Sequence, residues 1–418
     1  MSLVPVHGGL AAPVDRILTL DRKKALVEEA APLPRISVTD ADLSVVYRIA
    51  DGTLSPLVCF MGPKTYNTVL DEKRIDYDGK AYAWTIPFAL PVTEEEAAAL
   101  TIGKPAALYD ARGTLIGAIL VSSRFAWDKQ RYVEKVYGTS RLDHPGARIV
   151  MDDARGTLVG GEISVLPAAR HGEYADLLLS PARTRALIAD RKWEAALAFQ
   201  TRNPLHRAHE YALVYGVEQL TRSGKYAGVV LNPLVGQLKG DDVDASTRVR
   251  TYRILRDQRL LGQGDSDRSL WDSVGYDLND VFELVCLDQK MFYGGPSEAV
   301  MHAIYRQNHG FSHIVIGRKH ADAPYADGKA IWGDFDAQEI FSHLAGELHT
   351  QPVKVGFAAF YESIGRVDLT ENHPGVAPYS ISGTKLREQL VSGERPDVRI
   401  IRENVADVLI EAYRNRAS

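Results

Sequence analysis

The first part of the chain alternates short apolar stretches with turns that contain Gly and Asp. In "AYAWTIPFAL" and "AALYDARGTLIGAILV", apolar and polar positions follow the two-residue period of a strand. The turn "DARGTL" occurs twice, at 110–115 and 153–158, and each copy predicts a hairpin turn. This pattern predicts a mostly β domain with a few helices over residues 1–166.

From about Ala182 the pattern changes to helix-length segments that alternate with short apolar runs. Four runs have the length and character of buried strands: "ALAF", "AGVVLNP", "VFELVCL" and "HIVIGR". Because strands that alternate with helices form βαβ units, they predict an α/β fold with a parallel sheet. The polar loops after these strands are then expected at one edge of the sheet, where open parallel sheets bind ligands.

A third region follows Gly333, where the segment "DAQEIFSHLAGELH" precedes a strand "VKVGFAAFYES" and a loop-to-helix segment "YSISGTKLREQLVSG". We therefore expect three parts, at residues 1–166, 167–333 and 334–418. Three parts suit a chain of 418 residues, since a single core seldom grows beyond ~250–300 residues.

Composition narrows the class of protein. Hydrophobic residues make up 45% and charged residues 25% of the chain, as in ordinary globular proteins. No stretch approaches the ~20 apolar residues of a membrane span, and the N-terminus lacks a basic region followed by an apolar one. A cytoplasmic protein without a membrane partner is expected. The net charge of -5, with no basic run, argues against nucleic acid.

The two cysteines, Cys59 and Cys286, lie far apart in the sequence. They cannot form a Cys-x-x-Cys pair, so no structural zinc is expected.

The junction "FQTRNPLHRAHE" at 199–210 concentrates polar side chains between a strand and a helix. Asn203 is predicted to cap this helix, with Pro204 at the first helical position. His206 and His209, three residues apart, then share one face of the first turns. Three further polar residues fill the loop above the end of the strand: Gln200, Thr201 and Arg202.

These residue types favour an anion. A helix N-terminus offers free N–H groups and the positive end of the dipole, and the rigid fork of Arg202 suits a tetraoxyanion. No carboxylate or cysteine ligand accompanies His206 and His209, so polyphosphate is favoured over a metal. When protonated, they would stabilise charge that develops on a phosphate. A lone histidine is more often an ordinary structural residue; the convergence of several polar groups favours a site.

The loop "LNPLVGQLKGDDVD" at 231–244 carries a second set of candidates. Gly236 and Gly240 would let backbone approach a ligand, Lys239 would reach phosphate, and Asp241 or Asp242 would orient a metal-bound water. An ordinary polar loop after a strand explains the same residues, and both interpretations stay open.

Two further loops show the same character. "IGRKHADAP" at 316–324 follows a strand and adds a second source of positive charge. In "ISGTKLREQL" at 381–390, Ser382 or Thr384 can cap a helix, and Arg387 lies one turn inside it. An ordinary capped helix explains this stretch when it is taken alone, and its functional interpretation is a phosphate clamp. No GxxxxGK[ST] loop, GxGxxG turn or activated serine or cysteine motif is present. The common feature is anion binding without a protein nucleophile.

The motifs taken together resemble those of one family. "FQTRNPLHRAHEY" resembles the signature of the ATP sulfurylases (sulfate adenylyltransferases), and "ISGTKLREQL" resembles their second diagnostic stretch. Further matching stretches follow in the expected order: "HGGL", "LSPLVCFM", "VYGTSRLDHPGA", "SPARTRALI", "NPLVGQLKGDD" and "DAQEIF". The resemblance implies a PUA-like N-terminal β domain, a Rossmann-like nucleotidyltransferase domain and a small C-terminal α/β subdomain. It implies the short form, without an APS-kinase-like domain.

The resemblance also implies a reaction. ATP and sulfate would give adenosine 5′-phosphosulfate (APS) and pyrophosphate, with Mg²⁺ bound to the nucleotide. A sulfate oxygen would attack the α-phosphorus in line, without a covalent enzyme intermediate. A homo-oligomer is the family-level expectation.

Roles carry over from the family to matching positions. Gln200 and Arg202 would hold sulfate, together with the backbone N–H of Ala321. Thr201 and Asn203 would shape the loop and contact the nucleotide. The remaining residues would bind ATP and its phosphates, with adenine along residues 357–360: His206, His209, Gly317, Arg318, His320 and Phe360.

The second loop departs from the family pattern. The family usually has Gly-Arg-Asp-His-Ala-Gly, whereas this chain has Lys319 at the third position and Asp322 at the sixth. The segment that follows is also longer. As a hypothesis, the altered loop favours the dissimilatory direction, in which APS and pyrophosphate give ATP.

Two alternatives remain open at this point. One is an adenylyltransferase with another anionic acceptor, although such families usually have Gly before the second histidine, where this chain has Ala208. The other is a non-catalytic nucleotide or sulfate sensor.

Overall fold

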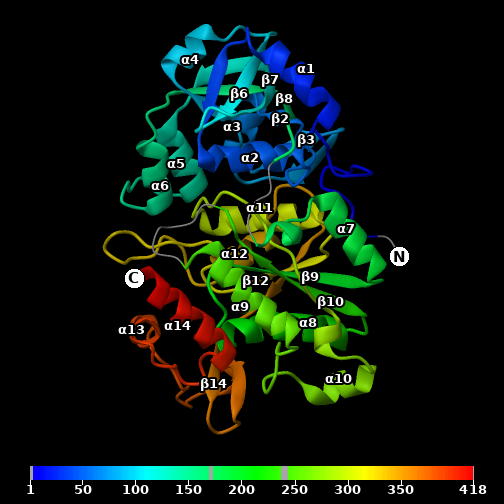
Figure 1. The fold of residues 1–418 in the computed structure, drawn as a ribbon, viewed down its shortest axis with the longest axis vertical. Coiled ribbons are helices and arrows are strands. Elements are labelled where there is room, and N and C mark those ends of the chain that lie inside the picture. The colour runs from blue at the N-terminus through cyan, green and yellow to red at the C-terminus, as the bar shows by residue number, and fades with distance from the viewer. Residues whose placement is uncertain (1–2, 169–172, 237–242, 418) are drawn as a thin grey trace.

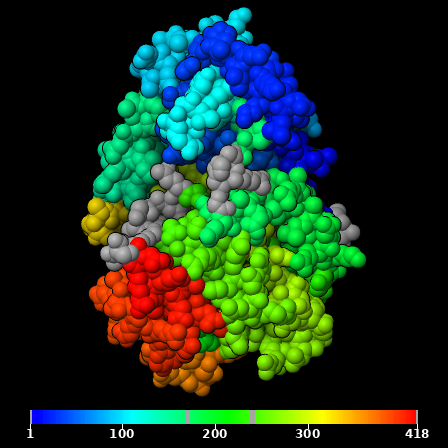
Figure 2. Space-filling model, in the orientation of Figure 1, coloured from blue at the N-terminus to red at the C-terminus, as the bar shows by residue number. Residues whose placement is uncertain are grey.

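The computed structural model describes residues 3–168, 173–236 and 243–417. Along the longest axis of the molecule an N-terminal domain is followed by a central domain, and the C-terminal region lies beside the lower part of the central domain (Figure 1). In the space-filling view, the C-terminal region (red) lies directly against the central domain (green) (Figure 2). The mixed α/β class predicted from the hydrophobic pattern is confirmed.

The N-terminal domain is built on a six-stranded sheet in the order β1-β6-β7-β8-β2, with β5 paired to β8. Only β1 and β6 are parallel among these pairs in the part of the chain described. The strands of the whole domain, including β3 and β4 outside this sheet, are β1 (Arg35–Val38), β2 (Cys59–Phe60), β3 (Arg74–Tyr77), β4 (Lys80–Ala83), β5 (Leu90–Val92), β6 (Pro105–Asp110), β7 (Leu115–Ala126) and β8 (Thr157–Val165). Its helices are α1 (Leu20–Ala30), α2 (Asp40–Ala50), α3 (Pro63–Glu72), α4 (Glu94–Ala99), α5 (Lys129–Tyr137) and α6 (Pro145–Met151).

The two "DARGTL" turns have different settings. The first connects β6 to β7 as a hairpin, as predicted. The second connects helix α6 to β8, so the hairpin prediction at 153–158 is wrong. The local turn is nevertheless the same, because Asp110 and Asp153 each accept the N–H of the residue two positions later at 2.9 Å. A short turn motif does not determine which element precedes it.

The central domain contains a fully parallel five-stranded sheet in the order β11-β10-β9-β12-β13. Its strands are β9 (Ala195–Thr201), β10 (Ala227–Pro233), β11 (Phe282–Leu284), β12 (His313–Ile316) and β13 (Gln351–Lys354). Its helices are α7 (Pro181–Asp190), α8 (Arg207–Arg222), α9 (Ala245–Asp257), α10 (Arg268–Val274), α11 (Gly295–Asn308) and α12 (Asp336–Glu339), with one-turn helices η1 (Ala175–Leu177), η2 (Leu278–Asp280) and η3 (Ile340–Ser342).

The strand order creates a crevice at the middle of this sheet. From β9 the chain proceeds outward to β10 and β11, then crosses to β12 and β13 on the other side of β9. The loops that leave the carboxyl ends of β9 and β12 therefore diverge. Ligands of open α/β sheets bind at this kind of switch point.

Helix α11 lies between the N-terminal and central domains and is buried along its length. Its apolar side chains divide between two cores: Val300, Met301, Ile304 and Tyr305 pack in the N-terminal core, and Ala299 and Ala303 in the central core. A helix that is apolar on opposite faces joins two layers. The two domains thus share α11 as a common wall.

The predicted strand at 353–363 is broken into two strands. Val353 and Lys354 belong to β13 of the central sheet, and β14 (Ala358–Tyr361) instead pairs with β15 (Arg366–Leu369) in an antiparallel hairpin. The break lies at Phe357, whose carbonyl accepts the N–H of Thr370 at 2.8 Å. One strand of the predicted 334–418 subdomain therefore lies in the central sheet.

The C-terminal region ends in two helices that follow the one-turn helix η4 (Thr370–Asn372): α13 (Gly383–Ser392) and α14 (Glu403–Ala417). This region contacts the first turn of α8. Arg402 forms two hydrogen bonds of 2.6 and 2.9 Å with the buried carboxylate of Glu210, and the carbonyl of Ile400 accepts the N–H of Arg207 at 2.8 Å. No helix in the described parts of the chain is long and apolar enough to cross a membrane.

Candidate active site

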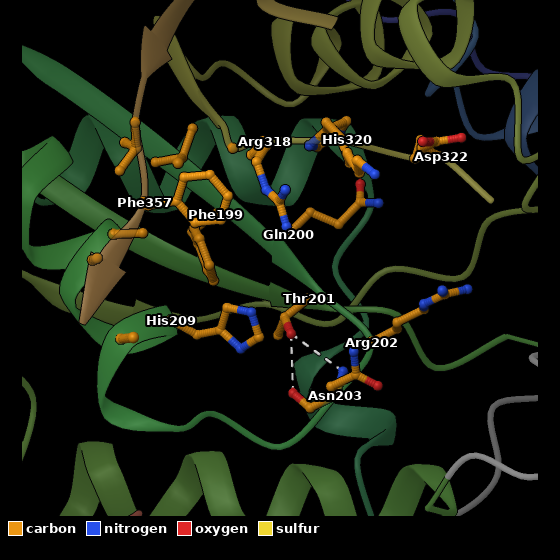
Figure 3. Close-up of a pocket in the computed structure, with 18 of the residues that line it drawn as sticks. Phe199, Gln200, Thr201, Arg202, Asn203, His209, Arg318, His320, Asp322 and Phe357 are labelled. Carbon is orange, nitrogen blue, oxygen red and sulfur yellow. Dashed lines mark hydrogen bonds between the residues drawn. The ribbon is translucent and has the colours of Figure 1, made fainter. Parts of the chain in front are cut away.

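A cavity of about 420 Å³ opens at the carboxyl edge of the central sheet, between the loops after β9 and β12. In Figure 3, Gln200, Arg318 and His320 lie on one side of the pocket, and Thr201 and His209 lie on the opposite side. The structure thus brings together most of the residues singled out from the sequence: Gln200, Thr201, Arg202, Asn203, His206, His209, Gly317, Arg318, His320 and Ala321.

Phe360 lies elsewhere. Its ring is buried in the central core, and the guanidinium carbon of Arg207 lies 5.1 Å from the ring centre. The cavity wall on this side is formed instead by Gly356, Phe357 and Ala358.

The loop after β9 is closed by its own hydrogen bonds. The Thr201 hydroxyl donates to the Asn203 carbonyl at 3.0 Å and accepts the Asn203 N–H at 3.2 Å. Tyr252 donates to the same carbonyl at 2.7 Å. This carbonyl is therefore not available to begin a helix, and the prediction that Asn203 caps α8 is wrong. The helix begins three residues later, with His206 as its N-cap.

His206 and His209 form a stacked pair, with ring centres 3.8 Å apart. Their predicted common face is confirmed. The His206 Nδ1 accepts the backbone N–H of His209 at 3.3 Å, so the ring proton of neutral His206 is on Nε2. This cap and the bond from Arg207 to Ile400 occupy two of the first three amides of α8. Fewer helix N–H groups remain for an anion than the sequence suggested.

Both histidines are neutral at pH 7 in the protein without ligand. Burial, and then the neighbouring His209, lowers the pKa of His206 to about 3. His209 exposes part of its ring to the cavity, yet the surrounding protein desolvates it and lowers its pKa as well. The expectation that the pair acts in its protonated form is therefore not met before an anion binds.

Arg202 has a free donor at the cavity. Its Nη1 is buried and has no hydrogen-bond partner among the described residues, and its guanidinium carbon lies 5.6 Å from the centre of the Tyr293 ring. A buried N–H without an acceptor is costly. An anion in the cavity would provide the missing acceptor.

The loop after β12 has an unusual backbone. Lys319 and Ala321 both adopt positive φ, at 49° and 57°, a region that residues other than glycine seldom occupy. Asp334 holds this loop, because its carboxylate accepts from Arg318 at 3.1 Å and its carbonyl accepts the Lys319 N–H at 2.9 Å. The Arg318 guanidinium carbon also lies 3.8 Å from the centre of the Phe357 ring.

The longer segment after this loop reaches the N-terminal domain. Tyr325 shares a hydrogen bond of 2.6 Å with Thr139, and the Arg141 guanidinium carbon lies 3.8 Å from the Tyr325 ring centre. Arg141 also forms an ion pair of 3.3 Å with Asp327. The N-terminal domain thus supports the second loop of the site.

Sequence reasoning missed a polar stripe on α11 behind the cavity. Glu298, His302 and Arg306 recur at every fourth position of a helix that is otherwise largely apolar and lie on one face of it. His302 Nδ1 shares a hydrogen bond of 2.9 Å with Nε2 of His320. Burial lowers the pKa values of both rings. The four-residue spacing within "SEAVMHAIYRQN" is the signal that would have found the stripe.

Glu298 holds the segment before α11. Its carboxylate accepts the N–H groups of Phe292 and Gly294, both at 3.0 Å. Burial nevertheless raises the pKa of Glu298 to about 7. The stripe therefore contacts the site loops from behind, outside the cavity lining.

The remaining candidates lie outside this cavity. Ser382 caps α13 as predicted, by accepting the Lys385 N–H at 3.2 Å, but Arg387 is not among the residues that line the cavity. Gly236 permits close packing against Asp288, since a β-carbon there would lie 2.5 Å from Asp288 Oδ1. Four candidates lie outside the described residues: Lys239, Gly240, Asp241 and Asp242.

Comparison with known proteins identifies the family. The ATP-sulfurylase family model matches residues 175–412, and a PUA-like domain matches residues 4–168. The chain belongs to the ATP-sulfurylase family. This confirms the resemblance and the PUA-like N-terminal domain, and it makes the protein a nucleotidyltransferase.

Relatives align over nearly the whole chain. The sulfate adenylyltransferase of Pyropia yezoensis is 53% identical over 412 residues, which are 98% of this chain and 97% of that protein. The sulfate adenylyltransferase of Halothermothrix orenii is 33% identical, over 98% of this chain and 99% of that one. A probable bifunctional SAT/APS kinase of Sorangium cellulosum is 34% identical, over 99% of this chain but 66% of its own length.

A solved structure shows the same fold. The hexameric APS kinase from Thiobacillus denitrificans superposes with a TM-score of 0.69 over 97% of this chain and 68% of that chain, at 20% identity.

Proposed function

We propose that this member of the ATP-sulfurylase family is a sulfate adenylyltransferase that converts ATP and sulfate to APS and pyrophosphate. The observation that carries the proposal is the cavity between β9 and β12, where two loops with cationic or donor side chains face each other. The unpartnered Nη1 of Arg202 adds a donor that needs an anion.

The chemistry balances without a protein nucleophile or a proton transfer. A sulfate oxygen forms a bond to the α-phosphorus of ATP. The bond from this phosphorus to the β-phosphate oxygen breaks, and pyrophosphate leaves with the electron pair. The protein then contributes by positioning the reactants in line and by stabilising negative charge.

Each of the two loops would contact both reactants. Gln200 and Arg202 would hold sulfate together with the backbone N–H of Ala321. Thr201 and Asn203 would shape the first loop. The phosphates of ATP would lie between two sets of donors, one from each loop: His206 and His209, and Gly317, Arg318 and His320.

The neutral histidines suit this arrangement. A polyphosphate placed beside His206 and His209 favours their charged forms and so raises their pKa values. The pair would then take up protons as the nucleotide binds.

Adenine would lie along Phe357 and Ala358, which line the cavity. The buried ring of Phe360 belongs to the core behind them.

Mg²⁺ would enter with ATP as part of the substrate. No group of three or more His, Cys, Asp or Glu side chains that could hold a metal occurs among the residues the structure describes. The ligands of Mg²⁺ would then come mainly from phosphate oxygens and water, as is usual for this ion. When bound, Mg²⁺ would draw charge from the phosphates.

Two assays would test the proposal side by side. The first is molybdate-dependent release of pyrophosphate from MgATP, because molybdate can occupy a tetraoxyanion site and its adenylyl product hydrolyses. The second is ATP formation from APS and pyrophosphate. Activity in both is expected. Activity in neither, from folded protein that binds ATP, would favour the sensor, and activity only with other anionic acceptors would favour another adenylyltransferase.

The ratio of the two rates bears on direction. The departures at Lys319 and Asp322 support the hypothesis that the enzyme makes ATP in sulfur oxidation. A protein that makes no ATP from APS and pyrophosphate would contradict it.

The homo-oligomer and the cytoplasmic location also stay predictions. Light scattering of the purified protein and fractionation of cells would test them.

A further inference from the structure

A buried cation lies behind the anion site. Arg306 on α11 has no measurable exposure to solvent, and its Nε and Nη2 have no hydrogen-bond partner among the described residues. Within the same residues, no carboxylate pairs with it. Burial lowers the pKa of Arg306 to about 9, so the guanidinium still carries its charge at pH 7. An unpaired buried charge is costly, which suggests that it serves the site.

A chain of two hydrogen bonds links this cation to the cavity. Nη1 of Arg306 donates to Oε1 of Gln289 at 3.1 Å. Nε2 of Gln289 then donates to Oε1 of Gln200 at 3.2 Å. Gln289 is itself buried, and Gln200 lines the cavity.

The donor and acceptor roles in these two hydrogen bonds follow from the chemistry of the guanidinium. A guanidinium has only donors, so the Gln289 amide must turn its oxygen toward Arg306 and its nitrogen toward Gln200. The oxygen of Gln200 is then occupied by Gln289. The N–H groups of the Gln200 amide are what remain for a ligand.

We propose that Arg306 and Gln289 are positioning residues that determine the anion specificity of the site by holding Gln200 as a donor. The inference rests on the proposed placement of sulfate at Gln200 and Arg202. Sulfate accepts on every oxygen. Hydrogenphosphate has the same charge and a similar shape, but it carries one O–H that needs an acceptor. A Gln200 amide that offers only N–H groups gives this O–H no acceptor and so disfavours hydrogenphosphate relative to sulfate.

Gln289→Glu tests the direction of the chain. A carboxylate at this position accepts from both Arg306 and Gln200, so the Gln200 amide turns and presents its oxygen to the cavity. The quantity to measure is the ratio of two constants at a pH where phosphate is mainly the dianion: the inhibition constant for inorganic phosphate and the KM for sulfate. Because both ligands are dianions, repulsion by the new carboxylate largely cancels from this ratio.

We expect the ratio to fall by about 10-fold or more in Gln289→Glu, which is the effect of one gained and one lost hydrogen bond to a charged ligand. The KM for ATP should change little. Gln289→Met adds no charge and removes both hydrogen bonds, so Gln200 can turn freely. For this variant we expect a smaller fall in the ratio and a several-fold rise in the KM for sulfate.

Arg185→Met is the matched control for Arg306→Met. Arg185 is partly buried and donates to two backbone carbonyls, of Gln307 at 3.1 Å and Val4 at 2.7 Å, without lining the cavity. Arg306→Met should lower the ratio, whereas Arg185→Met should keep the wild-type ratio even if it lowers thermal stability.

The outcomes separate the two proposals. A wild-type ratio in Gln289→Glu, or in Gln289→Met if the first variant does not fold, would overturn the role of the chain. Wild-type protein with no sulfate-dependent or molybdate-dependent turnover would instead overturn the proposed function.

Discussion

The two loops that form the candidate site differ in how they are held. The loop after β9 is closed by bonds between its own residues, such as those of Thr201 with Asn203, and none of its residues between Phe199 and Glu210 has positive φ. The loop after β12 has two such residues, Lys319 and Ala321. It is held from outside by Asp334 and by α11.

This difference indicates which loops can be predicted from their local sequence. A loop that satisfies its own hydrogen bonds can be placed from a short stretch of sequence. A loop in a strained backbone persists only because its surroundings impose it. Substitutions in the first loop should therefore affect mainly the binding and reaction of the substrates. Substitutions in the second loop should also affect the contacts that hold its backbone in place.

The largest effect should come from the first loop. His209→Ala removes a donor from the proposed phosphate site and should lower kcat by ~10²-fold or more, by analogy with the loss of one preorganised donor. Steady-state rates of ATP formation from APS and pyrophosphate would measure it. Wild-type kcat in this variant would show that the assigned role is wrong.

The arginines of the two loops should separate sulfate from nucleotide. Arg202→Ala should raise the KM for sulfate about 10- to 100-fold, and Arg318→Ala should raise the KM for ATP by a similar factor, because each loses charge-assisted hydrogen bonds of ~1.5–3 kcal/mol. Initial rates with one substrate varied at a time would measure both. If both variants affected the same KM, the roles proposed for the two arginines would be wrong.

Lowering the pH should destabilise the protein through both loops, because each contains a buried neutral histidine. His206 and His320, one in each loop, both have pKa values lowered by burial from 6.5 to about 3. The folded protein keeps them neutral, while the unfolded chain protonates them near pH 6.5. Their contribution to stability is thus complete above pH 6.5 and is lost as pH falls toward 3, by up to about 1.4 kcal/mol per pH unit for each histidine.

Urea unfolding at several pH values would measure this slope. His206→Asn retains a side chain that caps helices well. It should reduce the slope of the unfolding free energy against pH by the contribution of about one proton. His320→Asn should do the same despite the different backbone of its loop. An unchanged slope in either variant would mean that the residue is already charged when folded.

The smallest effects should have opposite signs in the two loops. Ala321→Gly relieves a positive φ and should stabilise the protein by roughly 1 kcal/mol. Ala208→Gly lies in the first turn of α8 and should destabilise by up to about 1 kcal/mol. Urea midpoints of the two variants would compare them. Destabilisation of equal size in both would show that the second loop is not strained.

The sequence was sufficient for the parallel sheet and for the residues of the first loop, because parallel strands place their following loops at one edge. It was insufficient where contacts with residues distant in the sequence determine the local structure. Tyr252 and Ile400 move the start of α8 from Asn203 to His206. The charge of the histidine pair depends on burial, which no local motif specifies.

Two further differences have the same origin. The strand predicted over 353–363 divides at Phe357, since the carbonyl there accepts the N–H of Thr370, directly after the hairpin that follows. The stripe of Glu298, His302 and Arg306 has the four-residue spacing of an ordinary polar helix face, so the spacing alone does not distinguish it from a solvated surface. The polar face becomes informative once the helix is known to be buried.

The ion pair between Arg402 and Glu210 has a mechanical consequence. Glu210 directly follows His209, so the last helix of the chain is attached one residue away from the proposed phosphate donors. Removing one partner of a buried pair costs ~3–5 kcal/mol, because the other charge is then left unpaired. Thermal fluctuations of about RT will not separate the two, and α14 and the histidine pair therefore move as a single rigid body.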